Sequence, residues 1–135
     1  MTDICGQPGV GKTQLCMMSA IEAVLQGQGV VYIDTEQKFD PTRLVHIATH
    51  TYPTVYSHMY STDAAHKLDS LLQHIQVHRP KTTSEFSNVV DQLQVQAIEH
   101  KVSLVVIDSI AALVKQEGMD EKQREKFVMA QVRVR

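Results

Sequence analysis

The sequence predicts an α/β fold in which helices flank a parallel β-sheet. Two continuous apolar runs, residues 30–34 and 104–109, have the composition of strands buried on both faces, and an aspartate lies at or beside the end of each. Segments with helical spacing of apolar residues separate these runs, and a glycine-rich turn precedes the first of them. The 135 residues suit a single domain.

The first third of the chain predicts a strand end, a helix, a buried strand and a second helix. Ile4 and Cys5 have the character of the end of a strand, and the apolar residues of 12–26 predict a helix packed under a sheet. Residues 30–34 form the next strand. Asp40 then suits a helix N-cap, since Pro41 follows at the first helical position, and Tyr52-Pro53 ends that helix.

The rest of the chain continues the alternation. Residues 64–72 predict a short helix and residues 75–78 a weaker strand. Thr82 and Glu85 form a possible capping box before a longer helix, whose buried face we expect to comprise Phe86, Val89, Val90, Leu93 and Ala97. Strands alternating with helices indicate a parallel sheet of four strands with right-handed crossovers.

Composition excludes several classes of protein. The net charge of −2 gives no sign of a polyanion binder, and the most apolar stretch, residues 15–25, is too short and too often interrupted by polar residues to cross a membrane. Cys5 and Cys16 lie among apolar residues without metal-ligand spacing, so we expect buried, reduced thiols. The expected protein is intracellular and has no membrane partner.

The glycine-rich turn matches the pattern G-x-x-x-x-G-K-[ST]. In this pattern the glycines let consecutive backbone N–H groups surround phosphate oxygens at the start of a helix. Lys12 would reach the terminal phosphates, and Thr13 would offer its hydroxyl to Mg²⁺. An ordinary glycine turn with an exposed lysine is the weaker alternative. The candidate phosphate-binding residues are Gly6, Gln7, Pro8, Gly9, Val10, Gly11, Lys12 and Thr13.

Two carboxylates follow apolar strands, on the edge of the sheet where ligands gather in this class of fold. Asp108 is placed to hold the shell of a Mg²⁺ ion, with a helix N-cap as the alternative. Glu36, two residues past Asp34, could orient or deprotonate the water that attacks a γ-phosphate, with a solvent-exposed loop acid as the alternative. Asp34 itself suits a structural role at the strand end.

Three segments together, GKTQLC, VVYIDTEQKFDPTRL and LVVIDSIAALV, resemble the ATPase core of the RecA-like recombinases of eukaryotes and archaea. Within that branch, KVSLVVIDSIAALVKQEG and VHIATHTYP are most similar to the paralogs that assist strand exchange, the B-type first and the C-type next. The resemblance covers nearly the whole chain. It implies a P-loop NTPase with a RecA-like parallel sheet, and residues 1–135 would form part of such an ATPase domain.

The resemblance also implies roles for individual residues. Residues 6–13 match the family's phosphate loop and Gln14 its following glutamine, while Asp108 matches the Mg²⁺-associated acid. Glu36 matches the water-activating glutamate, and Arg43 an arginine that packs near the adenine. One departure is the pair Gln37-Lys38, which stands where the recombinases usually have a glycine and which we expect to alter the loop around the phosphate.

At the level of function, the resemblance implies binding of ATP and Mg²⁺ in a hetero-oligomer with other recombinase paralogs. It also implies nuclear repair of DNA double-strand breaks by homologous recombination, with single-stranded or branched DNA contacted through the complex. The family's N-terminal helical module, γ-phosphate sensor strand and second DNA-binding loop have no match here, so we expect a fragment or shortened isoform. ATP hydrolysis would then require the missing segments or partner subunits.

The C-terminal segment leaves its function open. Residues 115–122 match the position of the family's first DNA-contacting loop, but they contain no aromatic residue for base stacking and equally suit a solvated connection. Asp120 could cap a last helix through Phe127, Val128 and Gln131.

Two other classes of protein share the phosphate loop. A small-molecule or nucleotide kinase would need lid arginines, for which Arg79 and Arg124 are the candidates. A non-catalytic module would use bound ATP to stabilise a partner interface.

Overall fold

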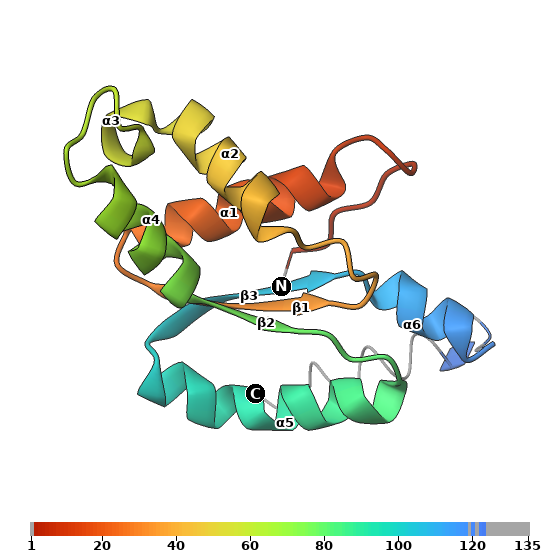
Figure 1. The fold of residues 1–135 in the computed structure, drawn as a ribbon. Coiled ribbons are helices and arrows are strands. Elements are labelled where there is room, and N and C mark those ends of the chain that lie inside the picture. Colours follow the sequence, from red (N-terminus) through yellow and green to blue (C-terminus); the bar gives the residue numbers. More distant parts are fainter. Residues whose placement is uncertain (1, 119, 121, 124–135) are drawn as a thin grey trace.

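The computed structural model describes residues 2–118, 120, 122 and 123. Helices separate the strands along this part of the chain, as the sequence predicts, and three helices follow one another between the first two strands (Figure 1). The elements are α1 (Lys12–Leu25), β1 (Gly29–Asp34), α2 (Pro41–Thr51), α3 (Pro53–Tyr56), α4 (Ala64–Gln73), β2 (Ile75–His78), α5 (Thr83–Glu99), β3 (Val102–Asp108) and α6 (Ile110–Gln116).

The strands form a parallel three-stranded sheet in the order β2-β1-β3. The register pairs Tyr32 with Val106 and Asp34 with Asp108, so the two strand-end aspartates lie side by side at one edge. The predicted α/β class and parallel sheet are thereby confirmed. Parallel pairing brings the carboxyl ends of β1 and β3 together, because both strands run toward the same edge of the sheet.

The prediction of a further strand at Ile4 and Cys5 is wrong. These residues lie outside any strand, and Ile4 is 44% exposed. Cys5 is exposed as well, which contradicts the expectation of a buried thiol, whereas Cys16 is partly buried against the core. An isolated extended segment gains stability only by pairing with a neighbouring strand. None of the described strands pairs with this one.

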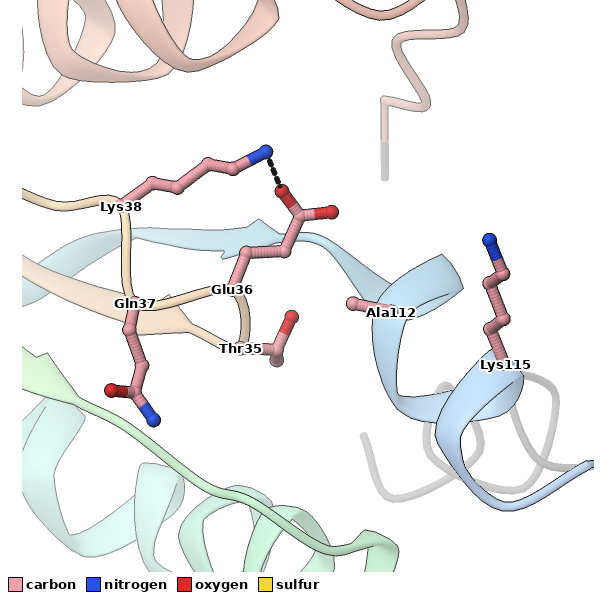
Figure 2. Close-up of a pocket in the computed structure, with 6 residues that line it drawn as sticks. All are labelled: Thr35, Glu36, Gln37, Lys38, Ala112 and Lys115. Atoms are coloured by element: carbon pink, nitrogen blue, oxygen red, sulfur yellow. Dashed lines mark ion pairs between the residues drawn. The ribbon is translucent and has the colours of Figure 1, made fainter.

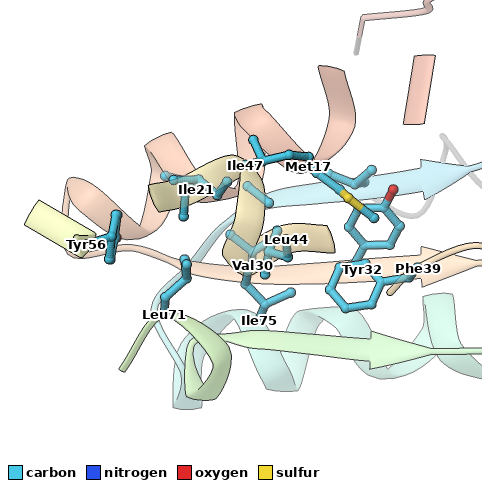
Figure 3. Packing of buried hydrophobic residues seen from close by; sticks show 14 residues of the cluster. Met17, Ile21, Val30, Tyr32, Phe39, Leu44, Ile47, Tyr56, Leu71 and Ile75 are labelled. Carbon is cyan, nitrogen blue, oxygen red and sulfur yellow. The ribbon is translucent and has the colours of Figure 1, made fainter. Parts of the chain in front are cut away.

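Helices cover both faces of the sheet. Figure 1 shows α1, α2, α3 and α4 on one side of the strands and α5 on the other. The first face buries the larger cluster, in which Met17 and Ile21 of α1 pack with Val30, Tyr32 and Leu44 (Figure 3). On the opposite face the core residues are Val31, Ile33, Phe86, Val90 and Leu113. Alternate residues of β1 therefore face the two helical layers, which explains why its run is apolar throughout.

The predicted helix starts depend on side-chain caps that the structure shows. Asp40 accepts a hydrogen bond from the Thr42 N–H at 2.9 Å, with Pro41 in the first helical position. Thr82 accepts from the Glu85 N–H at 3.2 Å, while the Glu85 carboxylate accepts from Lys81 N–H rather than from the cap residue itself. Of the two hydrogen bonds of a capping box, the one accepted by Thr82 is present as predicted. The one accepted by Glu85 comes from the residue before the cap.

Gly29 is required where the chain enters the sheet. A Cβ atom built on Gly29 would lie 2.4 Å from the carbonyl oxygen of His100, because β1 passes closely beside the turn that leads into β3. The register between the two strands also shifts between Gly29 and Val30. The close approach leaves no room for a side chain at this point.

Candidate functional site

The glycine-rich turn forms an exposed loop that leads directly into α1. Gly9 and Gly11 have φ values of 83° and 98°, in the left-handed region that glycine adopts at no cost. Gly11 is the N-cap of α1, and no side chain caps that helix. Figure 1 shows the loop at the end of the molecule toward which the strand arrows point. The loop thus presents backbone N–H groups and the positive end of a 14-residue helix at the ligand edge of the sheet.

Lys12 folds its amine back over this loop. Its Nζ donates hydrogen bonds to the carbonyl oxygens of Gly6 at 2.6 Å and Gln7 at 2.8 Å. The cation is therefore held against the carbonyl groups of the turn that precedes α1. This donor set fits the phosphates of a nucleotide, because a lysine and uncapped N–H groups at a helix N-terminus are complementary to an anion.

Asp108 lies at the end of β3 and is only 8% exposed. Its Oδ2 accepts a hydrogen bond from the hydroxyl of Tyr32 at 3.0 Å. Burial, followed by the charge of Asp108, raises the pKa of Tyr32, so the phenol stays protonated and remains a donor. Tyr32 is thus a positioning residue for the carboxylate.

Cys16, in the second turn of α1, lies near the same carboxylate. Burial raises the pKa of the Cys16 thiol, and the charge of Asp108 raises it further. Cys16 and Thr13 are three residues apart, so they are neighbours on one side of α1, which packs against β3. The Thr13 hydroxyl and the Asp108 carboxylate are oxygen donors of the kind that Mg²⁺ prefers.

We expect Tyr32→Phe to weaken the candidate metal site. The substitution leaves a buried oxygen of Asp108 without its donor, which should lower the free energy of unfolding by about 1–3 kcal/mol. Loss of an orienting partner should also weaken Mg²⁺ binding by about tenfold. Chemical denaturation and a Mg²⁺ titration measure the two effects. Tyr60→Phe is the matched control, because Tyr60 is 67% exposed in a loop away from the sheet.

Thr35 and Ser109 connect the segment that follows β1 to the segment that follows β3. The Thr35 N–H donates to the Asp108 carbonyl at 3.1 Å. The Thr35 hydroxyl donates to the carbonyl of Ser109 at 2.5 Å and accepts from the Ser109 N–H at 2.9 Å. The peptide bond between Asp108 and Ser109 is cis. The three hydrogen bonds of Thr35 fix the backbone of Glu36 relative to that of Asp108.

Asp34 fastens the loop that carries Glu36. The Asp34 carboxylate is fully buried and accepts from the N–H groups of Lys38 at 3.0 Å and Phe39 at 2.9 Å. Arg79 adds an ion pair to the same carboxylate at 3.4 Å and donates to the Phe39 carbonyl at 3.0 Å. Asp34 therefore has the predicted structural role, and Glu36 projects from an anchored turn.

Gln37 adopts the backbone conformation that glycine would take at this point. Its φ is 56°, which is uncommon for a residue with a side chain. The turn after Glu36 therefore keeps a left-handed residue even though this chain has no glycine there.

Glu36 lines an open pocket of about 560 Å³ at this edge of the sheet. Figure 2 shows its carboxylate paired with Lys38, while Lys115 of α6 lies on the far side of the pocket. The hydroxyl of Ser109 donates to the other Glu36 oxygen at 3.4 Å. The remaining lining residues are Thr35, Gln37 and Ala112.

Other predicted site residues lie apart from this pocket. Gln14 and Arg43 are exposed on α1 and α2, respectively. Arg79 is bonded to Asp34 and the Phe39 carbonyl, so it serves the loop rather than a kinase lid, and Arg124 lies outside the described residues. The predicted helix through Phe127, Val128 and Gln131 also lies outside them. Its proposed cap, Asp120, accepts from the Gln123 N–H at 2.8 Å.

The candidate DNA-contacting segment begins as helix. Lys115 belongs to the last turn of α6, and the Glu117 carboxylate accepts from both the N–H (2.9 Å) and the hydroxyl (2.7 Å) of Thr83. These two bonds hold the pKa of Glu117 below its usual range. The end of α6 is thereby fastened to the start of α5.

Four residues of the site were not identified from the sequence: Tyr32, Thr35, Lys38 and Ser109. The sequence does contain a signal for Tyr32, which precedes Asp34 by two residues. When Asp34 pairs with Asp108 in a parallel sheet, Tyr32 lies diagonally across from Asp108. Thr35 and Ser109 follow the two aspartates directly. The contact of Lys38 depends on the turn at Gln37, for which strand and helix periodicity give no information.

Comparison with known proteins gives consistent results. A family model described as Rad51 matches residues 1–132. The chain is 33% identical to the DNA repair protein RAD51 homolog 2 of Homo sapiens over 139 aligned positions, covering 95% of this chain and 35% of the relative. The protein of the same name from Arabidopsis thaliana is 31% identical, with coverages of 93% and 34%.

An archaeal relative is similar over much the same region. The DNA repair and recombination protein RadB of Methanococcus maripaludis is 30% identical, with 90% of this chain and 47% of the relative covered. This chain therefore spans about a third of the length of its RAD51 homolog 2 relatives. The resemblance to the B-type paralog and the RecA-like class of fold are confirmed, and the chain belongs to the Rad51 family.

Proposed function

We propose that this chain binds ATP with Mg²⁺ and forms part of a recombination protein that acts in DNA repair. The observation that carries this proposal is the phosphate loop, in which Lys12 lies within a glycine turn at the uncapped start of α1. In this proposal residues 6–13 and Gln14 hold the phosphates, and Arg43 packs near the adenine. Thr13 and Asp108 supply oxygen ligands to the metal.

Hydrolysis, where it occurs, would use Glu36 as the general base. Mg²⁺ would neutralise charge on the phosphates when it is bound. Glu36 accepts a proton from water while the water oxygen bonds to the γ-phosphorus and the bond from that phosphorus to the β–γ bridging oxygen breaks. The products are ADP and inorganic phosphate. Lys12 stabilises the negative charge of the phosphate oxygens.

The names of the relatives support a proposal for the cellular role. The relatives named above are DNA repair and recombination proteins. We propose that this chain works in homologous-recombination repair in the nucleus, together with other recombinase paralogs, and that the complex contacts single-stranded or branched DNA. Among the described helices, none is long and apolar enough to cross a membrane.

ATP turnover measured with and without single-stranded DNA at two salt concentrations tests this proposal. We expect slow turnover by the chain alone and faster turnover when paralogs and DNA are added. Higher salt should weaken the DNA response, because phosphate contacts release counterions. Phosphate transfer to a small acceptor, with no response to DNA, would instead favour a nucleotide or small-molecule kinase.

A non-catalytic role is the second candidate. The observation that favours it is the ion pair between Glu36 and Lys38, which occupies the carboxylate needed for hydrolysis. In that case bound ATP would stabilise an interface with a partner paralog. Capture of paralogs that requires ATP but tolerates Glu36→Gln would single out this function.

A further inference from the structure

Among the residues that the structure describes, Lys38 is the cation that pairs with the candidate general base, and both belong to one tight turn. Its amine forms an ion pair with Glu36 Oε2 (Figure 2). The Ser109 hydroxyl donates to Oε1 at 3.4 Å. Both carboxylate oxygens therefore have partners within the protein. A general base needs a free lone pair within hydrogen-bond reach of the water it deprotonates, so each of these partners reduces the number of lone pairs that Glu36 can offer.

The backbone holds the pair together. The Lys38 N–H is bonded to the buried carboxylate of Asp34, and Gln37 between the two partners has a left-handed conformation. Arg79 fastens Asp34 from outside the turn. The anchored loop therefore holds the backbone of Lys38 within reach of Glu36, and the side chain completes the contact. The hydrogen bond and charge of Glu36 also raise the pKa of the Lys38 amine, so the lysine stays charged.

The pair is nevertheless accessible. The Lys38 side chain is 61% exposed and that of Glu36 is 31% exposed. Solvent screens ion pairs of this kind, and their contribution to stability is small. Lys38 can therefore move away from Glu36 without disruption of the fold. An accessible pair that covers a catalytic group is suited to slowing a reaction rather than preventing it.

We propose that Lys38 restrains Glu36, so that the carboxylate accepts a proton from water only while Lys38 is displaced, and that Lys38 thereby slows ATP hydrolysis. This inference rests on the proposed function, because it assigns a regulator to the same base. Displacing Lys38 from this exposed ion pair costs little free energy. Removing the lysine charge should therefore accelerate hydrolysis by only about two- to fivefold.

The test compares the purified full chain with its Lys38→Met variant, which keeps a side chain of similar length without the charge. We expect Lys38→Met to raise kcat for Mg·ATP by about two- to fivefold and to leave ATP affinity, measured separately, within twofold. Lys81→Met removes an exposed lysine outside the pocket and should change neither quantity. In a Glu36→Gln background Lys38→Met should give no gain, because the two residues act through one contact.

The outcomes separate this inference from the proposed function. If ATP binds in a Lys12-dependent manner but Lys38→Met leaves kcat unchanged or lowers it, the inference is overturned and the proposed function stands. The same holds if turnover is undetectable in both proteins. If ATP does not bind, the proposed function fails and the inference fails with it. The ion pair itself can be measured without nucleotide. The pKa of the Lys38 amine, followed by NMR, should fall in the Glu36→Gln variant. An unchanged pKa would also overturn the inference.

Discussion

Lys12→Ala should reduce the affinity of this chain for Mg·ATP by roughly 100-fold. A charged hydrogen bond to a ligand contributes about 1.5–3 kcal/mol, and Lys12 would make such bonds to the terminal phosphates. In the structure its amine bonds to the carbonyl oxygens of Gly6 and Gln7 within the loop itself. The substitution would therefore remove a proposed phosphate contact with little effect on the core. Isothermal titration with ATP in the presence of Mg²⁺ measures the loss.

Two controls make the Lys12→Ala result interpretable. Lys81→Ala removes an exposed lysine that lies before α5 and should bind ATP as the unaltered chain does. A thermal unfolding curve checks that Lys12→Ala is folded. Wild-type affinity in a folded Lys12→Ala variant would mean that the glycine turn is an ordinary loop with an exposed lysine.

Glu36→Gln should leave ATP affinity within about twofold but reduce turnover by roughly 100- to 10,000-fold. General-base catalysis contributes rate factors of this size, and glutamine keeps the shape of glutamate without its basic oxygen. The backbone of the turn is held by Asp34 and Thr35, neither of which the substitution alters. Steady-state release of phosphate, set against a binding titration on the same sample, separates the two effects.

The matched control for Glu36→Gln is Glu99→Gln, at the exposed end of α5. Its turnover should equal that of the unaltered chain. If Glu36→Gln and Lys12→Ala lose ATP binding equally, Glu36 does not have the role of a base. If Glu36→Gln retains full turnover, another group activates the water and the proposed role of Glu36 as general base is wrong.

Much of this fold could be predicted from the sequence because its strands are buried on both faces. The apolar run that ends at Asp34 has no amphipathic alternation, which is typical of a parallel strand between two helical layers, and β1 contacts both core clusters. Asp40 and Thr82 marked helix starts through the chemistry of capping. Burial and capping are local properties, so they can be inferred without the tertiary structure.

The features that could not be predicted depend on contacts between residues far apart in the sequence or on the backbone conformation of a single residue. Ile4 and Cys5 have the composition of a strand, but a strand exists only where a neighbour pairs with it. The pairing of Lys38 with Glu36 follows from the left-handed turn at Gln37, a residue that rarely adopts that conformation. Arg79 was a candidate lid residue until its ion pair with Asp34 showed a structural role.

In the proposed function, the loop before α1 and the Asp108 carboxylate form one Mg²⁺–nucleotide site. Titration of ATP into the full chain with Mg²⁺, and again with the metal chelated, tests it most directly. We expect saturable binding with Mg²⁺, at least tenfold weaker binding without it, and loss of this metal dependence in Asp108→Asn, since Asp108 would supply a metal ligand. No binding in either condition, or equal binding in both, would contradict the claim.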